Sequence, residues 1–146
     1  MIRYLWVDKN AIYNNITEDR ALKLLGEDLD RAKILVLNTI NWRTGDYIKN
    51  NIGGNTKLSA VNSKLISLLA KLINDLNPDL NILTETEKNI FTNLLTMSEN
   101  GYSDSNLALN TTELVLEALN NSELLISEVN NAESVSDLIN ILEKIK

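Results

Sequence analysis

The stretch that decides the fold is residues 57–76, KLSAVNSKLISLLAKLINDL. Leu58, Leu65 and Leu72 recur in it every seven residues, and further apolar side chains fall on the same side. Apolar residues at this spacing line one face of an α-helix, so the stretch predicts an amphipathic helix. Thr56 is placed to cap its first turn, and Asn77-Pro78 ends it, because the residue before a proline is driven out of the helical conformation. We expect the other helices to pack around its leucine stripe.

The length and composition predict one helical domain. The chain has 146 residues, and a hydrophobic content of 44% can form a core without disulfides. Its apolar residues are mostly Leu, Ile, Val and Ala, with one Phe, two Trp and one Pro, which favours helices over a β-sandwich. We therefore expect a mainly α protein, a small bundle of about five to six helices that forms a single domain over residues 1–146.

The chain contains neither cysteine nor histidine. Without cysteine no disulfide or thiolate metal site can form, and without histidine most acid–base and nucleophilic mechanisms lose their usual group. The densest acidic group, Glu27, Asp28 and Asp30, is typical of the first turn of a helix. Gly53-Gly54 lacks the spacing and the following lysine of a phosphate-binding loop. We predict a protein that is not an enzyme and has no catalytic residues, no cofactor and no metal site.

Charge is distributed unevenly along the chain. The net charge is −6, but residues 1–77 contain 11 basic and 8 acidic residues, whereas residues 78–146 contain 3 and 12. The predicted domain therefore divides into an N-terminal arm (1–16), a basic-leaning helical half (17–77) and an acidic half of short helices (78–146). Because acidic residues repel phosphates, we expect no direct binding of nucleic acid.

Targeting signals are not recognisable in the sequence. No charged-then-apolar signal opens it, and no apolar run approaches the roughly 18 residues that a membrane span needs. We expect no membrane partner and a location in the cytoplasm or in a virion. Asparagine occurs 22 times, which is typical of proteins from AT-rich genomes such as those of low-GC bacteria and their phages.

The N-terminal residues predict an extended arm. Residues 1–7, MIRYLWV, are rich in β-branched and aromatic side chains and precede a turn signal at 8–10, which indicates a short strand. Residues 11–16 would add a second strand, and such a hairpin must dock on helices or on another chain because two strands alone are marginal in water. We favour an arm that covers the core; the alternative is an assembly element that presents Tyr4 and Trp6 to a partner.

The helix that Thr17 begins continues to about residue 42, either as one helix or as two that break at Gly26. Residues 42–56, WRTGDYIKNNIGGNT, are dense in Gly and Asn and predict a long connecting loop. We favour the interpretation that its aromatic rings fill the end of the helix pair; the alternative is a binding loop. The residues that would form the binding loop are of types enriched at interaction hot spots: Trp42, Arg43, Asp46 and Tyr47.

The acidic half contains a capping box and a weak repeat. Thr84 and Glu87 match the box and predict a helix that ends near Gly101. Asparagine then recurs every ten residues from 110 to 140, and continuous helix would place such positions roughly 80° out of phase per step. We interpret the repeat as caps of three short helices, at about 112–119, 122–129 and 134–145; the alternative is a hairpin that turns at residues 120–121.

Lys57, Lys64 and Lys71 recur every seven residues beside the leucine stripe. They form a basic edge of the kind that flanks the seam of a coiled coil. The acidic half is their natural partner, and a contact between chains would then be head-to-tail. The simpler interpretation is that the lysines only solubilise a surface helix.

The uneven charge and the scarcity of catalytic groups favour a non-enzymatic assembly protein. We expect a helical adaptor or structural subunit of a phage or virion that binds copies of itself or a larger protein assembly. The alternative is an acidic inhibitor that imitates nucleic acid in the basic groove of a partner protein. The predicted interaction residues are Tyr4, Trp6, Trp42, Arg43, Asp46, Tyr47, Lys57, Lys64, Lys71, Glu113, Glu117, Glu128 and Asp137.

Overall fold

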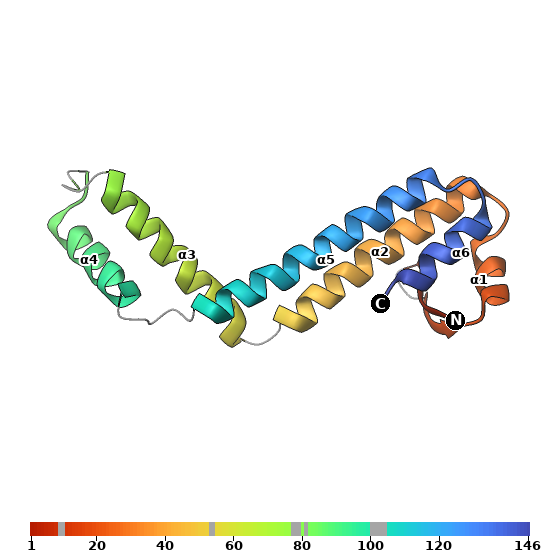
Figure 1. The fold of residues 1–146 in the computed structure, drawn as a ribbon, viewed down its shortest axis with the longest axis horizontal. Coiled ribbons are helices and arrows are strands. Elements are labelled where there is room, and N and C mark those ends of the chain that lie inside the picture. Colours follow the sequence, from red (N-terminus) through yellow and green to blue (C-terminus); the bar gives the residue numbers. More distant parts are fainter. Residues whose placement is uncertain (9–10, 53–54, 77–79, 81, 100–104) are drawn as a thin grey trace. The chain divides into compact units, whose positions relative to one another are not determined.

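The computed structural model describes residues 1–8, 11–52, 55–76, 80, 82–99 and 105–146 (Figure 1). Over these residues the chain forms one hairpin and six helices, which confirms a mainly α bundle with an N-terminal hairpin. The elements are β1 (Ile2–Asp8), β2 (Ala11–Ile16), α1 (Glu18–Leu25), α2 (Leu29–Ile52), α3 (Asn55–Leu76), α4 (Glu85–Glu99), α5 (Ser105–Asn131) and α6 (Val135–Lys144).

The chain forms two compact units. The first unit consists of Met1–Asn51 and Leu116–Lys146, and the second unit is Ile52–Val115. The helix α5 is continuous across the boundary at residue 115. The division at residue 77 that the charge pattern suggested does not coincide with either boundary, and the single domain over residues 1–146 stays a prediction.

The N-terminal hairpin belongs to the core of the first unit. β1 pairs antiparallel with β2, with Leu5 opposite Tyr13, and β1 contacts both α1 and α6. Ile2 and Leu5 are fully buried, whereas Tyr4 and Trp6 are half-buried. The arm therefore covers the core, as favoured from the sequence, and does not extend freely toward a partner. Residues 9–10, where the turn was expected, lie outside the described part of the chain.

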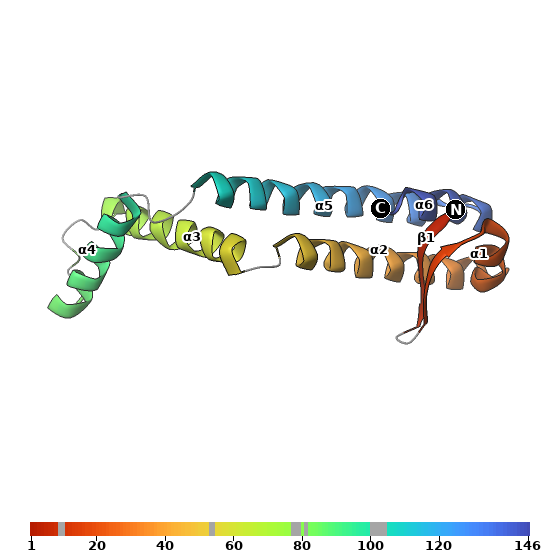
Figure 2. The same cartoon turned by 90° about the horizontal axis from the view of Figure 1, so that it is seen from below.

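The core of the first unit joins the two ends of the sequence. Its most buried side chains come from β1, α1, α2, α6 and the last turns of α5. Within this unit α2 and the C-terminal part of α5 lie side by side in both views (Figures 1 and 2), and Lys33 Nζ donates to the carbonyl oxygen of Asn130 at 3.1 Å. The fully buried large residues are Ile2, Leu5, Leu25, Val36, Thr39, Ile40, Val129, Leu138 and Leu142.

Of the two alternatives for the first predicted helix, the break at Gly26 is correct. The Thr17 hydroxyl accepts from the backbone amide of Arg20 at 3.4 Å and caps α1. Gly26 ends α1 with a φ of +76°, a conformation that glycine adopts without the strain of a Cβ atom. Asp28 then accepts from the backbone amide of Arg31 at 3.2 Å, so this acidic group serves the start of α2, as expected.

The predicted loop at residues 42–56 is wrong, because α2 continues as helix to Ile52. Contacts along the helix offset the cost of a helical glycine at Gly45, which is about 1 kcal/mol. Asp46 accepts from Arg43 at 2.9 Å and from Asn50 at 3.2 Å, and the side chain of Asn51 donates to the carbonyl of Tyr47 at 2.8 Å. Gly and Asn therefore did not mark a loop here. Residues 53–54 lie outside the described chain.

The repeat in the acidic half is also not what the sequence suggested. A single helix, α5, occupies Ser105–Asn131, so the two short helices at 112–119 and 122–129 and the alternative hairpin are all wrong. No Gly or Pro interrupts this stretch, and Thr111 and Thr112 donate to carbonyls one turn earlier. The third short helix is present as α6, which Ser134 caps.

The ends of α3 and α4 largely follow the sequence signals. α3 begins at Asn55, so Thr56 lies inside the helix and the cap predicted there is wrong. The helix ends at Leu76, and the predicted stop at 77–78 lies outside the described residues. Before α4, the backbone amide of Thr84 donates to Glu87 at 2.8 Å, and the amide of Glu87 donates to the Thr84 hydroxyl at 3.3 Å. The capping box is confirmed, and the predicted end near Gly101 falls outside the described chain.

Candidate interaction surfaces

Five of the predicted interaction residues lie together in the first unit. We call Tyr4, Trp42, Arg43, Asp46 and Tyr47 the Arg43 cluster. The guanidinium carbon of Arg43 lies 4.6 Å from the ring centroid of Tyr4 and 5.8 Å from that of Tyr47. The rings of Tyr4 and Trp42 meet edge to face, with centroids 5.8 Å apart. The cluster therefore brings the β1 strand into contact with the middle of α2.

Hydrogen bonds complete the surroundings of Arg43. Its Nη1 donates to Asp46 Oδ2 at 2.9 Å, and its Nε donates to the backbone oxygen of Lys146 at 2.7 Å. The guanidinium thus stacks on aromatic rings and uses two of its five N–H donors within the fold. These contacts join α2 to β1 and to Lys146, and the choice between rings that fill the end of a helix pair and a binding surface stays a prediction.

Trp6 is joined to α2 through its backbone. Its backbone amide donates to the hydroxyl of Thr39 at 3.0 Å, and that hydroxyl donates to the carbonyl of Leu35 at 2.8 Å. Thr39 is fully buried, so both of its hydrogen bonds compensate for the loss of water. The role of Thr39 could not be predicted from the sequence, because a threonine inside a helix is unremarkable until the strand that it meets is known.

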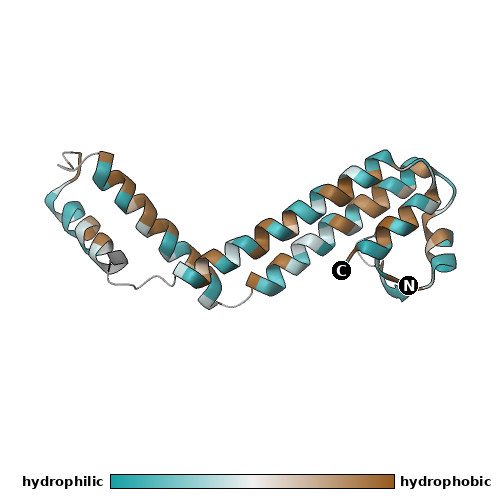
Figure 3. Cartoon of the chain, viewed as in Figure 1, coloured by the Kyte–Doolittle hydropathy of each residue, from teal (hydrophilic) through white to brown (hydrophobic). Residues whose placement is uncertain are grey.

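The large apolar side chains of α3 are exposed. We call Leu58, Leu65, Ile66, Leu68, Leu69, Leu72, Ile73 and Leu76 the leucine face; each of these residues is between 45% and 77% exposed. Figure 3 shows apolar residues along the length of this helix. The expectation that the other helices pack around the leucine stripe is therefore wrong for the described residues.

The side of α3 that is buried consists of small residues. Ala60, Ser67 and Ala70 are at most 8% exposed, and Ser63 and Asn74 are half-buried. These five positions alternate in steps of three and four, so they form a second helical stripe opposite the leucine face. Within its unit α3 contacts α4, and small side chains let two helices approach closely. This spacing was visible in the sequence, but the leucine stripe predicted burial more strongly.

The predicted lysine edge borders the leucine face. Lys57, Lys64 and Lys71 each precede one of the leucines that recur every seven residues. Lys71 is exposed, and the other two are half-buried. Neither Lys64 nor Lys71 forms an ion pair with another described residue. The expected pairing of this edge with the acidic half is thus not seen for these two lysines.

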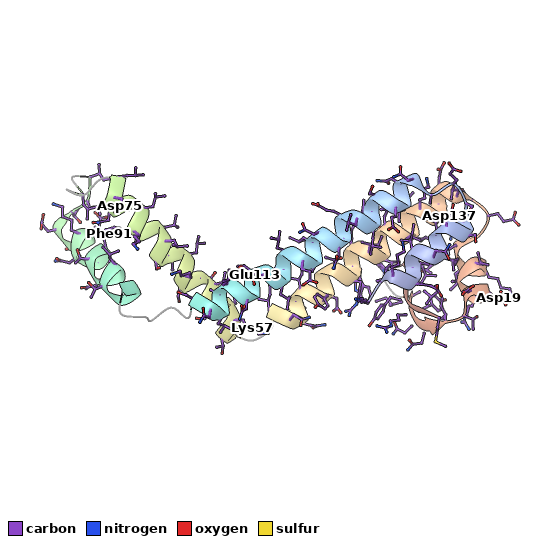
Figure 4. All side chains as sticks on the ribbon, viewed as in Figure 1. Asp19, Lys57, Asp75, Phe91, Glu113 and Asp137 are labelled. Atoms are coloured by element: carbon purple, nitrogen blue, oxygen red, sulfur yellow. The ribbon has the colours of Figure 1, made fainter. Side chains whose placement is uncertain are left out.

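Two of the four predicted acidic interaction residues are engaged inside the first unit. Glu128 accepts from Lys144 at 2.6 Å. Asp137, at the start of α6 (Figure 4), accepts from the backbone amides of Glu133 at 3.0 Å and Ser134 at 2.9 Å. A hydrogen bond from the Ser134 side chain and those from the two amides lower the pKa of Asp137 below its ordinary value. Both carboxylates therefore have a structural role.

The other two acids remain available on α5. Glu113 and Glu117 are exposed, and they lie beside Leu109 and Leu116, which are 53% and 58% exposed. Leu119, three residues further on, is 45% exposed. This apolar stripe was not predicted from the sequence, because the assumed helix breaks concealed its seven-residue spacing.

Charge is uneven between helices but not between units. The first unit has 10 basic and 13 acidic residues, and the second unit has 4 and 7, so each has a net charge of −3. The reason is that the acidic C-terminal segment folds with residues 1–51. α3 still contains three Lys and one Asp, whereas α5 contains four Glu and no basic residue. Electrostatic complementarity therefore exists at the scale of these helices.

The remaining features of the described residues bear on metal binding, catalysis and membranes. Among the residues described, no three His, Cys, Asp or Glu side chains gather to hold a metal ion. One depression of about 430 Å³ in the first unit is lined by Thr17, Asp19, Arg20, Lys23 and Leu24, and it contains a single carboxylate. In the portion of the chain that the structure covers, no helix combines the length and apolar character needed to cross a membrane.

No protein-family model, curated protein or solved structure matches the chain. The functional proposal therefore depends on the surfaces of the molecule. The most distinctive of these surfaces is the leucine face, because its large apolar side chains are exposed while the small residues on the opposite side of α3 are buried.

Proposed function

We propose that the chain is a non-enzymatic assembly protein that binds other protein molecules through the leucine face of α3. The observation that supports this proposal is the inverted burial of α3, whose small side chains are covered while eight large apolar ones are exposed. Soluble proteins rarely expose contiguous apolar patches beyond a few hundred Å², and larger ones mark interaction sites. The leucine face is therefore a docking surface for protein.

The energetics require extensive coverage of this face. Complete burial of one Leu or Ile side chain is worth about 1.5–3 kcal/mol. Eight side chains that are about half covered already would gain on the order of 8 kcal/mol. Because association itself costs about 4–15 kcal/mol, a contact with one end of α3 would not form a stable complex. A partner that covers the whole face and also buries apolar side chains of its own is needed to offset this cost.

We propose a location in the cytoplasm or in a phage particle, where the protein would act as an adaptor or structural subunit. Its support is the small size, the helical fold and the asparagine-rich composition. Structural subunits of this kind need surfaces for neighbouring proteins and no catalytic apparatus.

A second function, an acidic module that binds a basic groove, has weaker support. The exposed Glu113 and Glu117 and the absence of basic residues on α5 favour it. Glu128 and Asp137, on which this function also depended, are occupied by Lys144 and by the α6 cap. Reversal of Glu113 and Glu117 to lysine should abolish binding to a basic partner if this function is correct.

The proposed function is tested by placing charges in the leucine face. The double variant Leu65→Glu/Leu72→Glu should elute from a size-exclusion column as a smaller species than the wild type, because a charge cannot be buried without a partner. Its helix content by circular dichroism should be retained, since both positions are about half exposed. Ile34→Glu is a matched control, because Ile34 is 58% exposed on α2 of the first unit. An elution volume equal to that of the wild type would contradict the proposal.

A further inference from the structure

We infer that the leucine face of α3 packs against the same face of α3 in other copies of the chain, with the helices parallel and in register. This inference rests on the proposed function and adds the identity of the partner. The whole surface lies on one helix, which belongs to the second unit.

A coiled-coil pattern runs along the middle of the leucine face. In a coiled coil, the core positions a and d alternate in steps of three and four residues. Six exposed residues of α3 follow this spacing, and we call them the α3 seam: Leu58, Asn62, Leu65, Leu69, Leu72 and Leu76. The buried small residues lie on the opposite side of the helix, so the seam is directed away from them.

The residues that flank the seam also match between copies. In a parallel coiled coil, the residue just before each a position (g) faces the residue just after a d position (e), five residues further along the neighbouring helix. On α3 this places Val61 of one copy opposite Ile66 of the next, and Leu68 opposite Ile73. Both flanking contacts are therefore apolar. The lysine edge lies outside these flanks, so the parallel arrangement leaves its charges in water.

Asn62 selects the parallel arrangement and its register. In that arrangement equivalent a positions face each other, so the Asn62 side chains of the copies meet, and each amide can both donate and accept a hydrogen bond. A shift by one heptad, or an antiparallel arrangement, would place Asn62 against leucine, because every other residue of the α3 seam is leucine. The buried amide would then have no hydrogen-bond partner, which is unfavourable.

The exposed area is sufficient for a stable interface. The large side chains of the leucine face expose on the order of 700 Å² per copy, close to the roughly 800 Å² per partner that a standard protein interface buries. A second leucine face contributes the same apolar area from its own side, which helps to offset the cost of association. Because identical faces meet with the helices parallel, rotational symmetry about an axis along α3 closes the assembly.

Cysteine variants test the geometry, since the chain contains no cysteine of its own. Leu58→Cys and Leu76→Cys place a thiol at either end of the α3 seam, about 27 Å apart along the helix. On mild oxidation, each variant alone should form more disulfide dimer than the control Ile34→Cys, whose position is 58% exposed in the first unit. In a mixture of the two variants, one of which carries a mass tag, disulfides between them should not exceed the control level.

Two results of this experiment would overturn the inference. If disulfides between the two variants exceed those within each variant, the α3 helices are antiparallel. If both variants form no more disulfide dimer than Ile34→Cys does, α3 of a second copy is not the partner of the leucine face.

Asn62 provides an independent test. Asn62→Leu should tighten association by about tenfold or more, measured by sedimentation equilibrium, because the seam then no longer buries an amide. The matched control is Asn41→Leu, since Asn41 is exposed on α2 of the first unit, and it should leave association unchanged. Association of Asn62→Leu that is equal to or weaker than that of the wild type would contradict the position of the seam.

The failures of the two proposals can be told apart. If Leu65→Glu/Leu72→Glu separates the assembly but neither cysteine variant forms a disulfide dimer above the control, the leucine face is an interface whose partner is not a second α3. If that charged variant leaves the assembly unchanged, the proposed function fails together with the inference.

Discussion

Arg43 connects three parts of the first unit that are distant in the sequence. Its guanidinium lies over the Tyr4 ring from β1, bonds to Asp46 one helical turn away, and donates to the backbone of Lys146 at the C-terminus. Its side chain is 18% exposed, so these contacts are only partly screened by water. A lysine at this position would keep the charge but would lack the planar group that stacks on the ring and the fixed fork of N–H donors that reaches both acceptors.

Arg43→Ala should therefore destabilise the fold by about 1–3 kcal/mol, since it removes the stacking and two hydrogen bonds to a charged group. Arg43→Lys should recover only part of that loss. The measurement is the free energy of unfolding in urea, with the exposed Lys49→Ala on the same helix as control. An Arg43→Ala protein within about 0.5 kcal/mol of the wild type would show that the cluster does not stabilise the fold.

Two carboxylates should make helix formation sensitive to acid. Hydrogen bonds from the backbone amide and the hydroxyl of Thr84 lower the pKa of Glu87 below 4.5, and the Ser134 cap lowers that of Asp137 below 3.8. Because its pKa is lower in the folded protein, each carboxylate stabilises the fold at pH values above its ordinary pKa. This stabilisation is lost as the pH falls through the lowered pKa. Helix content by circular dichroism should therefore decline as the pH falls below the ordinary pKa values of these two carboxyl groups.

The variant Asp137→Asn isolates the contribution of α6. Its amide oxygen can still accept from the backbone, but it has no charge to lose, so the acid-induced loss of helix should be smaller than in the wild type. A pH profile identical to that of the wild type would show that the cap does not contribute to acid sensitivity.

At the scale of helices, local signals were predictable from the sequence and long-range packing was not. The Thr17 cap, the Thr84–Glu87 box and the break at Gly26 act within a few residues, so sequence spacing was enough to place them. The burial of the small face of α3 depends on which helix it meets, and no residue pattern within α3 specifies that. The leucine stripe was found correctly and assigned to the wrong environment.

The two incorrect loop predictions have a common cause. Asparagine and glycine favour turns by their intrinsic propensity, but a helix that is stabilised by packing against the rest of the fold tolerates them. Gly45 lies inside α2, and asparagines recur through α5 without breaking it. The assumed breaks also concealed the exposed leucines Leu109, Leu116 and Leu119 on one side of α5. The residues of the Arg43 cluster were all named from the sequence, but the contacts between them were not predicted.

Gly45→Ala tests the correction to α2. Gly45 is helical, and a Cβ atom there would meet nothing within 4 Å, so the variant should be more stable by about 0.5–1 kcal/mol. Gly26→Ala should be less stable, because the φ of +76° strains any residue with a Cβ atom. Thermal unfolding of both variants provides the comparison. A loss of stability in Gly45→Ala would contradict the continuous helix.

At the scale of the whole molecule, the two units differ in how completely they bury their apolar residues. The first unit encloses a core built from both ends of the chain. The second unit leaves most of the large side chains of α3 exposed. Each unit has a net charge of −3, so overall charge does not favour contact between copies, and the proposed assembly rests on apolar contact.

The mass of the wild-type protein by sedimentation equilibrium, measured over a concentration series, tests this account most directly. The monomer has a mass of 16.4 kDa. We predict that the mass rises above this value with concentration and that Leu65→Glu/Leu72→Glu holds it at the monomer value. A wild-type protein that stays at 16.4 kDa at every concentration, or a charged variant that associates as the wild type does, would contradict assembly through the leucine face.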